Sequence, residues 1–244
     1  MKRRSIDAFN LPERVSRYDA DMAVMHPNRS KMVQIALEVL PFEQGASVKA
    51  LDLGVGTGYF TAKFLEAYPN ARVYALDGAK AMLEVARARL GDGRDNVSLH
   101  LGDFRELRQK FSTAGSFDVV FSSYALHHLS REEKGSVVEQ AASLLRPNGW
   151  CLNADIVAAA TPGLEQMIQG IRVRGIVERA AGRDDRFGDF ETTRRYLDER
   201  EAEVGDRPLT LQEDLEVLRE AGLQDLAVFW LEYREAVIGG RKAG

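Results

Sequence analysis

Short apolar runs alternate with helical patterns over residues 48–156, and this alternation constrains the fold more than any other feature of the chain. Each run is bounded by turn residues and has the length of a buried strand. Strands that alternate with helices in this way form a parallel sheet covered by helices. The expected strands are residues 48–53, 72–76, 97–101, 117–123 and 150–156.

Helical patterns fill the intervals between these runs. One begins near residue 59 and ends before Pro69, and another covers about 79–90. A third covers about 132–145 and is followed by Arg-Pro-Asn-Gly at 146–149, which predicts a turn. The core is therefore expected to be an α/β sheet with flanking helices.

The segments on either side of this core have a different character. Residues 5–40 predict two helices separated near His26-Pro27, and we expect them to cap the core. The charged stretch 161–204 predicts helices that form an insertion against the functional edge of the sheet. A closing helix at 211–221 and two strands at 226–233 and 235–240 complete the pattern.

The whole chain is expected to be one domain, since its 244 residues are within the range of a single α/β domain. Its predicted parts are an N-terminal cap (1–45), a cofactor-binding core (46–157), a helical insertion (158–208), and a closing helix and strands (209–244).

The composition of the chain indicates which kinds of partner and which cellular compartment to expect. The net charge of −4 disfavours a nucleic-acid-binding surface, and the basic cluster Lys2, Arg3 and Arg4 is more typical of a solvated tail. A lone cysteine, Cys151, excludes an internal disulfide. No stretch approaches the roughly 18 apolar residues of a membrane span. We therefore expect a cytoplasmic protein without a membrane association.

Gly54, Gly56 and Gly58 follow the first expected strand and precede a helix. Glycine permits positive φ and lets a ligand approach the backbone, while a helix N-terminus offers unpaired N–H groups. Dinucleotide sites have the spacing G-x-G-x-x-G, but here Tyr59 occupies the place of the third glycine. The spacing G-x-G-x-G therefore disfavours a nicotinamide oxidoreductase.

Acidic residues in or after three strands indicate the ligand. Asp52 suits the ammonium group of an amino acid, and Asp77, at the end of the second strand, can accept hydrogen bonds from ribose hydroxyls. Asp103 ends the third strand and can accept one from an exocyclic amine, while Phe104 and Met82 can pack on a flat base. An ammonium, a ribose and an adenine together describe S-adenosylmethionine.

At this point the chain resembles the class I S-adenosylmethionine-dependent methyltransferases. The resemblance spans roughly residues 48–156 and rests on the motifs LDLGVGTG (51–58), YALDGAKAMLEVARARL (74–90), LGDF (101–104), FDVVFSSYALHHL (117–129) and LLRPNGWCLNADI (144–156). It implies a Rossmann-like, seven-stranded, mostly parallel sheet with flanking helices and a final antiparallel strand, and here with an N-terminal helical cap and a helical insertion after the fifth strand.

The resemblance also implies a set of cofactor-binding residues. The glycines would line the methionine part, Asp77 would bind the ribose, and Ser122 would lie near the transferred methyl group. The full implied set is Asp52, Gly54, Gly56, Gly58, Asp77, Gly78, Met82, Gly102, Asp103, Phe104 and Ser122.

Residues for the chemistry and the acceptor are less clearly marked. Tyr18 lies in VSRYDADM, which resembles the cap segment of small-molecule methyltransferases, although it could equally be an aromatic residue that packs the cap. The candidates for catalysis are Tyr18, His127 and His128. Those for the acceptor side are Tyr18, Tyr124, Arg194 and Arg195. His26 and His100 have no ligand-spaced partners, so no metal site is expected.

The expected function is transfer of a methyl group from S-adenosylmethionine to a small-molecule acceptor. Residues 194–242 also resemble the end of carboxy-S-adenosylmethionine synthase, an enzyme of tRNA wobble-uridine modification. This resemblance implies that Arg194 or Arg195 would hold the added carboxylate. A non-catalytic protein that binds S-adenosylmethionine is the third possibility. The insertion at 161–205 could mediate a homodimer.

Overall fold

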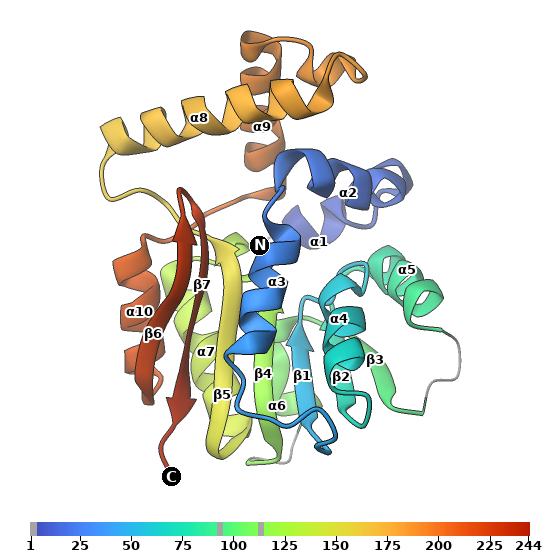
Figure 1. Cartoon of the computed structure of the whole chain (residues 1–244), viewed down its shortest axis with the longest axis vertical. Helices are drawn as coiled ribbons and strands as arrows, with labels where there is room; N and C mark the ends of the chain where they lie inside the picture. The colour runs from blue at the N-terminus through green and yellow to red at the C-terminus, as the bar shows by residue number, and fades with distance from the viewer. Residues whose placement is uncertain (1–3, 92–94, 112–114) are drawn as a thin grey trace.

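A seven-stranded sheet with the order β3-β2-β1-β4-β5-β7-β6 forms the centre of the computed structural model, which describes residues 4–91, 95–111 and 115–244 (Figure 1). Within these residues β7 runs antiparallel to both of its neighbours, and the other pairings are parallel. The strands are β1 Lys49–Leu53, β2 Arg72–Asp77, β3 Val97–Leu101, β4 Phe117–Ser123, β5 Leu145–Ile156, β6 Leu223–Glu232 and β7 Glu235–Lys242. The predicted fold class is confirmed.

Helices cover both faces of the sheet. One face carries α3, α4 and α5, and the other carries α6, α7 and α10. The helices of the described chain are α1 Arg4–Ala8, α2 Pro12–Met25, α3 Arg29–Glu38, α4 Tyr59–Ala67, α5 Lys80–Leu90, α6 Leu107–Lys110, α7 Arg131–Leu144, α8 Pro162–Ala180, α9 Phe190–Val204 and α10 Leu211–Glu220, with short 3-10 turns η1 Phe104–Glu106, η2 Leu126–His128 and η3 Asp185–Phe187.

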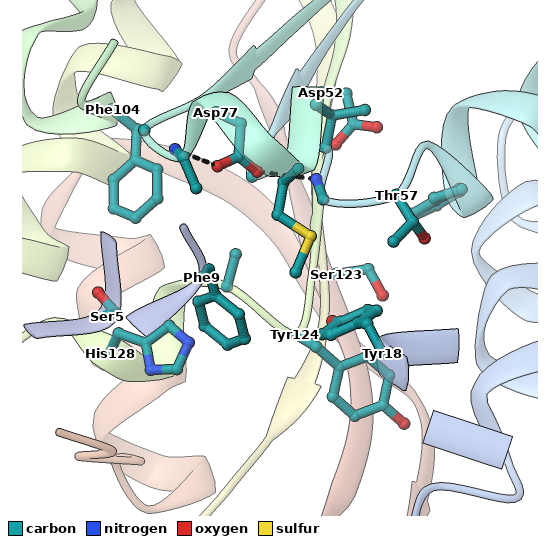
Figure 2. Close-up of a pocket in the computed structure, with 18 of the residues that line it drawn as sticks. Ser5, Phe9, Tyr18, Asp52, Thr57, Asp77, Phe104, Ser123, Tyr124 and His128 are labelled. Carbon is teal, nitrogen blue, oxygen red and sulfur yellow. Dashed lines mark hydrogen bonds between the residues drawn. The ribbon is translucent and has the colours of Figure 1, made fainter. Parts of the chain in front are cut away.

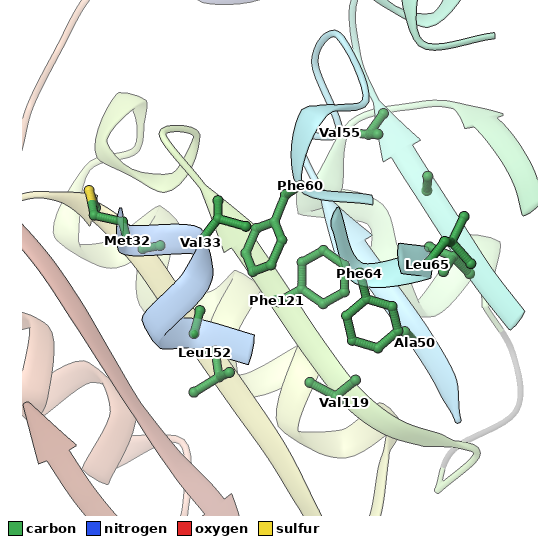
Figure 3. Close-up of a cluster of buried hydrophobic side chains, with 14 of the residues drawn as sticks. Met32, Val33, Ala50, Val55, Phe60, Phe64, Leu65, Val119, Phe121 and Leu152 are labelled. Atoms are coloured by element: carbon green, nitrogen blue, oxygen red, sulfur yellow. The ribbon is translucent and has the colours of Figure 1, made fainter. Parts of the chain in front are cut away.

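Strand alternation divides the core into two layers. Ala50 of β1 packs toward α3 and α4, whereas its neighbour Leu51 packs toward α7. In the first layer the ring of Phe121 lies between Phe60 and Phe64, at centroid distances of 4.3 and 5.0 Å (Figure 3). Because these rings are almost fully buried, they fix how α4 sits on the sheet, and α4 directly follows the glycine loop.

Local signals set where the elements begin. Ser130 accepts a hydrogen bond from the backbone N–H of Glu133, whose side chain accepts one from the backbone of Ser130, so a capping box starts α7. Thr210 and Glu213 form the same arrangement at the start of α10. These helices therefore begin at fixed points just beyond η2 and the insertion.

Three expectations about element boundaries are wrong. The N-terminal segment contains three helices, because the chain also breaks before Pro12. The expected turn at 146–149 is part of β5, which starts at Leu145 and accommodates Asn148 at φ +63° with a register shift opposite β4. The sixth strand begins at Leu223 rather than at 226. Of the basic cluster, Lys2 and Arg3 lie outside the described residues.

The cap and the insertion lie together above the carboxyl ends of the parallel strands (Figure 1). Met25 of α2 is buried against Val173 and Ile176 of α8. Arg186, in the turn between α8 and α9, donates hydrogen bonds to both oxygens of Asp21 of α2, at 2.7 and 3.1 Å. These contacts join the two segments into one cover. None of the described helices is long and apolar enough to span a bilayer.

Candidate functional site

A cavity of about 810 Å³, its open mouth included, lies between this cover and the carboxyl ends of β1, β2 and β4 (Figure 2). Crevices at this edge of an open α/β sheet are where such folds bind ligands. Its walls are formed by Ser5, Ile6, Phe9, Tyr18, Arg29, Asp52, Gly54, Val55, Gly56, Thr57, Tyr59, Phe60, Asp77, Gly78, Ala79, Met82, Asp103, Phe104, Ser123, Tyr124, Ala125 and His128.

The glycine loop curves around this cavity with positive φ angles. Gly54 has φ +79°, and a Cβ there would overlap the Cβ of Ala125. Gly56 has φ +54°, and the nearest protein atom to a Cβ there would be the carbonyl oxygen of Gly54 at 3.9 Å. The first glycine is therefore required by packing, while the second leaves the backbone open toward a ligand.

Asp77 ties this loop to the end of β2. Its Oδ2 accepts a hydrogen bond from the Gly56 backbone at 2.8 Å, and its Oδ1 accepts one from Ala79 at 2.8 Å (Figure 2). Burial raises the pKa of the carboxyl, although these backbone donors act in the opposite direction. Each oxygen keeps a further lone pair, so the carboxylate can accept hydrogen bonds from two vicinal hydroxyl groups.

Asp52 lies on the side of the cavity away from Phe104 (Figure 2). Its Oδ2 accepts a hydrogen bond from Thr61 at 2.5 Å, and its side chain is buried. Burial raises the pKa of Asp52 to about 7, against the effect of Thr61. Arg29 lines the same cavity and lies over the Tyr59 ring at 4.2 Å. A cation and an acid together suit the charged ends of an amino acid.

The opposite end of the cavity is apolar. Met82 and Phe104 line it, and Ile6 of α1 closes it so tightly that a Cβ at Gly78 would lie 2.6 Å from the Ile6 Cδ1. Asp103 also lines this end, but Arg105 binds both of its carboxylate oxygens, at 2.8 to 3.0 Å. An adenine amine would therefore share Asp103 with this arginine.

Three of the expected cofactor residues do not line the cavity. Gly58 lies against Ala86 and Leu90, where a Cβ would come within 3.3 Å, so it packs α4 onto α5. Gly102 lies beneath the side chain of Lys110. Ser122 faces the other side of the sheet and donates a hydrogen bond to the Leu53 carbonyl at 2.7 Å. Strand alternation places its neighbour Ser123 in the cavity instead.

A second cavity of about 490 Å³ adjoins the first beneath the insertion. Phe9, Tyr18, Tyr124 and His128 line both cavities and form the wall between them. The remaining lining residues are Met22, Met25, His26, His127, Ile156, Arg172, Arg200, Glu201, Val204 and Asp206.

Two of the acceptor-side candidates lie on this shared wall, and two do not. Burial raises the pKa of Tyr18, and the Tyr124 hydroxyl donates a hydrogen bond to Glu235 at 2.7 Å. Arg194 pairs with Asp198 at 2.9 Å near the surface of α9, and Arg195 is exposed on the same helix. Neither arginine lines either cavity, so the structure does not bring them to the other acceptor-side candidates.

The two candidate histidines have different surroundings. His127 Nδ1 lies 2.6 Å from Asp155 Oδ1, and its Nε2 lies 3.5 Å from Asp206. Burial alone would lower the pKa of His127, but the two carboxylates outweigh it and raise the pKa to about 10. Burial and the neighbouring His127 lower the pKa of His128. At neutral pH, His128 is therefore the better proton acceptor.

Several residues that line the two cavities belong to no recognisable motif in the sequence. Arg29 and Phe9 come from the cap, and Asp206 comes from the loop after α9. No fixed spacing connects them to the glycine loop, and only the docking of the cap and insertion brings them to the site. Thr57 lies within the glycine motif, which could have indicated it.

Comparison with known proteins identifies the core. Residues 50–149 match the model of a family described as "Methyltransferase domain". These residues form a class I S-adenosylmethionine-dependent methyltransferase domain. The predicted family is confirmed, and S-adenosylmethionine is the cofactor of this methyltransferase domain.

Relatives of this methyltransferase domain are similar over part of their length. An uncharacterized methyltransferase of Anoxybacillus flavithermus is 34% identical over 130 residues, which is 53% of this chain and 57% of the relative. Among solved structures, an O-methyltransferase family protein of Burkholderia thailandensis has a TM-score of 0.67 at 19% identity, over 97% of this chain and 62% of that one. Phosphoethanolamine N-methyltransferase 2 of Haemonchus contortus, solved with S-adenosyl-L-methionine, has a TM-score of 0.64 at 19% identity, over 91% and 45%. The chain spans little more than half the length of the curated relative.

Proposed function

We propose that this chain transfers the methyl group of S-adenosylmethionine to a small-molecule acceptor that binds in the second cavity. The observation that carries the proposal is the shared wall: Tyr18, Tyr124 and His128 line both cavities. A sulfonium methyl group near this wall would face an acceptor on the other side of it.

The binding of the cofactor follows from the geometry of the first cavity. Asp77 would accept hydrogen bonds from the two ribose hydroxyls, and Asp52 would attract the ammonium group. Arg29 would face the carboxylate of the methionine part. Met82 and Phe104 would pack against the adenine, while α1 covers it.

The chemistry requires little from the protein beyond alignment. The acceptor atom attacks the methyl carbon, the carbon–sulfur bond breaks, and its electron pair stays on sulfur as a neutral thioether. Since the leaving group needs no proton, most of the catalytic effect comes from holding the nucleophile in line and excluding water. His128 lies on the shared wall, where its ring would contact a hydroxyl or thiol acceptor.

The cover supports an acceptor of small size. The first cavity is covered by α1 and α2, and the second by α2, α8 and α9, with buried side chains such as Met22 and Val204 in its wall. A nucleic acid or a folded protein would need an open, extended surface instead. The carboxy-S-adenosylmethionine alternative loses its expected arginines, because Arg194 and Arg195 lie outside both cavities.

The cofactor half of the proposal is tested by Asp77→Ala. Loss of charged, buried hydrogen bonds should weaken S-adenosylmethionine binding by about 1–3 kcal/mol, or roughly 5- to 150-fold, in titration calorimetry. Asp95→Ala, which changes an exposed aspartate, should leave the affinity unchanged. Equal affinities for the two variants would remove Asp77 from the site.

The acceptor half is tested with isotopically labelled methyl donor and fractionated cell extract. We expect label in the low-mass fraction and none in RNA or protein. Val204→Phe, which fills the second cavity, should abolish this transfer while the calorimetric affinity for the donor persists. Label in RNA or protein, or a carboxylated donor retained by the purified chain, would overturn the proposal.

A further inference from the structure

His127, His128 and Asp206 form a cluster on the wall of the second cavity. One ring nitrogen of each histidine and one carboxylate oxygen lie within 4.8 Å of one another. The histidines belong to η2, while the aspartate comes from the loop that follows α9. The loop is held in place, since the backbone N–H of Arg207 donates a hydrogen bond to the His127 carbonyl at 2.7 Å.

One pair in this cluster is in ion-pair contact but lacks aligned hydrogen-bond geometry. His128 Nδ1 lies 2.8 Å from Asp206 Oδ1, yet the geometry of the pair does not meet that of a hydrogen bond. Both atoms are fully buried, and neither has another hydrogen-bonding partner among the described residues. Two buried polar atoms without an aligned hydrogen bond are costly, and a cation in contact with both would offset that cost.

Two of the three ligand distances are compatible with a metal ion in contact with these atoms. Ligand atoms about 2.0–2.1 Å from a tetrahedral zinc ion lie roughly 3.3 Å apart. The distance from Asp206 Oδ1 to His128 Nδ1 is 2.8 Å, and that to His127 Nε2 is 3.5 Å, so the two values bracket this spacing.

The surroundings of His127 provide the second layer of such a site. Its Nδ1 lies 2.6 Å from Asp155 Oδ1, and the other oxygen of Asp155 accepts a hydrogen bond from the His127 backbone at 3.1 Å. Histidine ligands of metals commonly donate their second N–H to a carboxylate in this way. Asp155 and Asp206 also place two carboxylates beside the histidines.

We propose that His127 Nε2, His128 Nδ1 and Asp206 Oδ1 bind a divalent transition metal of the zinc class. Two imidazoles and one carboxylate are ligands that suit zinc, cobalt(II) or iron(II). Three protein ligands leave a coordination position open, and all three residues line the second cavity. That position would therefore face the space assigned to the acceptor, where an oxygen or sulfur atom could complete the coordination.

The test measures metal alone, without any methyl donor, so that its result does not depend on the proposed transfer reaction. The untagged chain is stripped with chelator and titrated with ZnCl₂ by calorimetry and with CoCl₂ by visible absorption. We expect one equivalent to bind with a Kd of about 1 µM or tighter, and cobalt to show the intense d–d bands of a four-coordinate site.

Substitutions test whether zinc binds at this cluster or at another histidine. Asp206→Asn keeps the shape of the side chain and His128→Ala removes a ring, and each should weaken zinc binding at least tenfold. His100→Ala, which changes a histidine outside the second cavity, should have no effect. Circular dichroism checks that each variant is folded.

Two outcomes would overturn the proposal. One is the absence of stoichiometric zinc or cobalt binding to the folded wild-type chain. In that case the two carboxylates are paired with a protonated His127 instead of a metal ion. The other is an unchanged zinc affinity in both folded variants, because the metal would then be bound elsewhere on the protein.

Discussion

Asp52 combines deep burial with a position on the wall of the cofactor cavity. A carboxyl removed from water holds its proton more strongly, and its pKa of about 7 means that much of it is neutral near physiological pH. The ammonium group of the cofactor interacts favourably only with the ionised form. Binding of S-adenosylmethionine is therefore linked to the loss of a proton from this residue.

This linkage predicts that cofactor affinity increases as the pH rises through about 7. Below the pKa of Asp52 a proton must leave before the ammonium can bind, so affinity should fall by up to about tenfold per pH unit. Calorimetry from about pH 5.5 to pH 7.5 measures the slope. Asp52→Asn should bind more weakly at neutral pH and lose this dependence. A wild-type affinity that is flat across the range would contradict the assignment.

At the scale of elements, charged groups also join the helices that support the site. Lys134 of α7 and Asp214 of α10 form a fully buried ion pair, with Nζ 2.7 Å from Oδ1. Burial raises the pKa of Asp214 in spite of the lysine, which shows how much the removal from water opposes its charge. α7 begins just after η2, the turn that carries both histidines.

Removing one charge of this ion pair should destabilise the protein more than removing both charges. Lys134→Met leaves a buried carboxylate without its partner and should lower the free energy of unfolding by about 3–5 kcal/mol. Lys134→Met combined with Asp214→Leu replaces both charges with apolar groups and should recover much of that loss. Urea denaturation measures both. A double variant no more stable than the single one would argue against an electrostatic cause.

Most of the elements were predictable from the sequence, because the period of apolar residues is a local property of the chain. The same is true of Asp52 and Asp77, since the carboxyl ends of neighbouring parallel strands meet at one edge of a sheet. Ser122 was assigned to the wrong side because a shift of one residue reverses the face of a strand. The extension of β5 through 146–149 depends on pairing with β4, which composition does not reveal.

At the scale of the whole molecule, the second cavity is formed where the cap and the insertion dock on each other. Arg29 and Asp206 are 177 positions apart in sequence (206 − 29), yet both lie beside the shared wall. No local pattern predicts such a meeting, since it depends on the tertiary packing of Met25 against α8 and of Arg186 against Asp21. The acceptor side was therefore the part that the sequence predicted least well.

Loosening this cover should speed the loss of cofactor. Arg186→Gln removes the paired hydrogen bonds to Asp21 and an ion pair with Asp184 at 2.6 Å. We expect faster dissociation of S-adenosylmethionine in stopped-flow measurements, by several-fold, with a smaller change in the association rate. Arg194→Gln, on the outer part of the same insertion, is the matched control. Equal dissociation rates for the two variants would show that the contacts between cap and insertion do not slow the release of the cofactor.

The close approach of Ile6 to Gly78 has a kinetic consequence. Because α1 rests directly on the loop after β2, the beginning of the chain closes the adenine end of the cavity. A smaller side chain at position 6 should therefore let the proposed cofactor exchange faster.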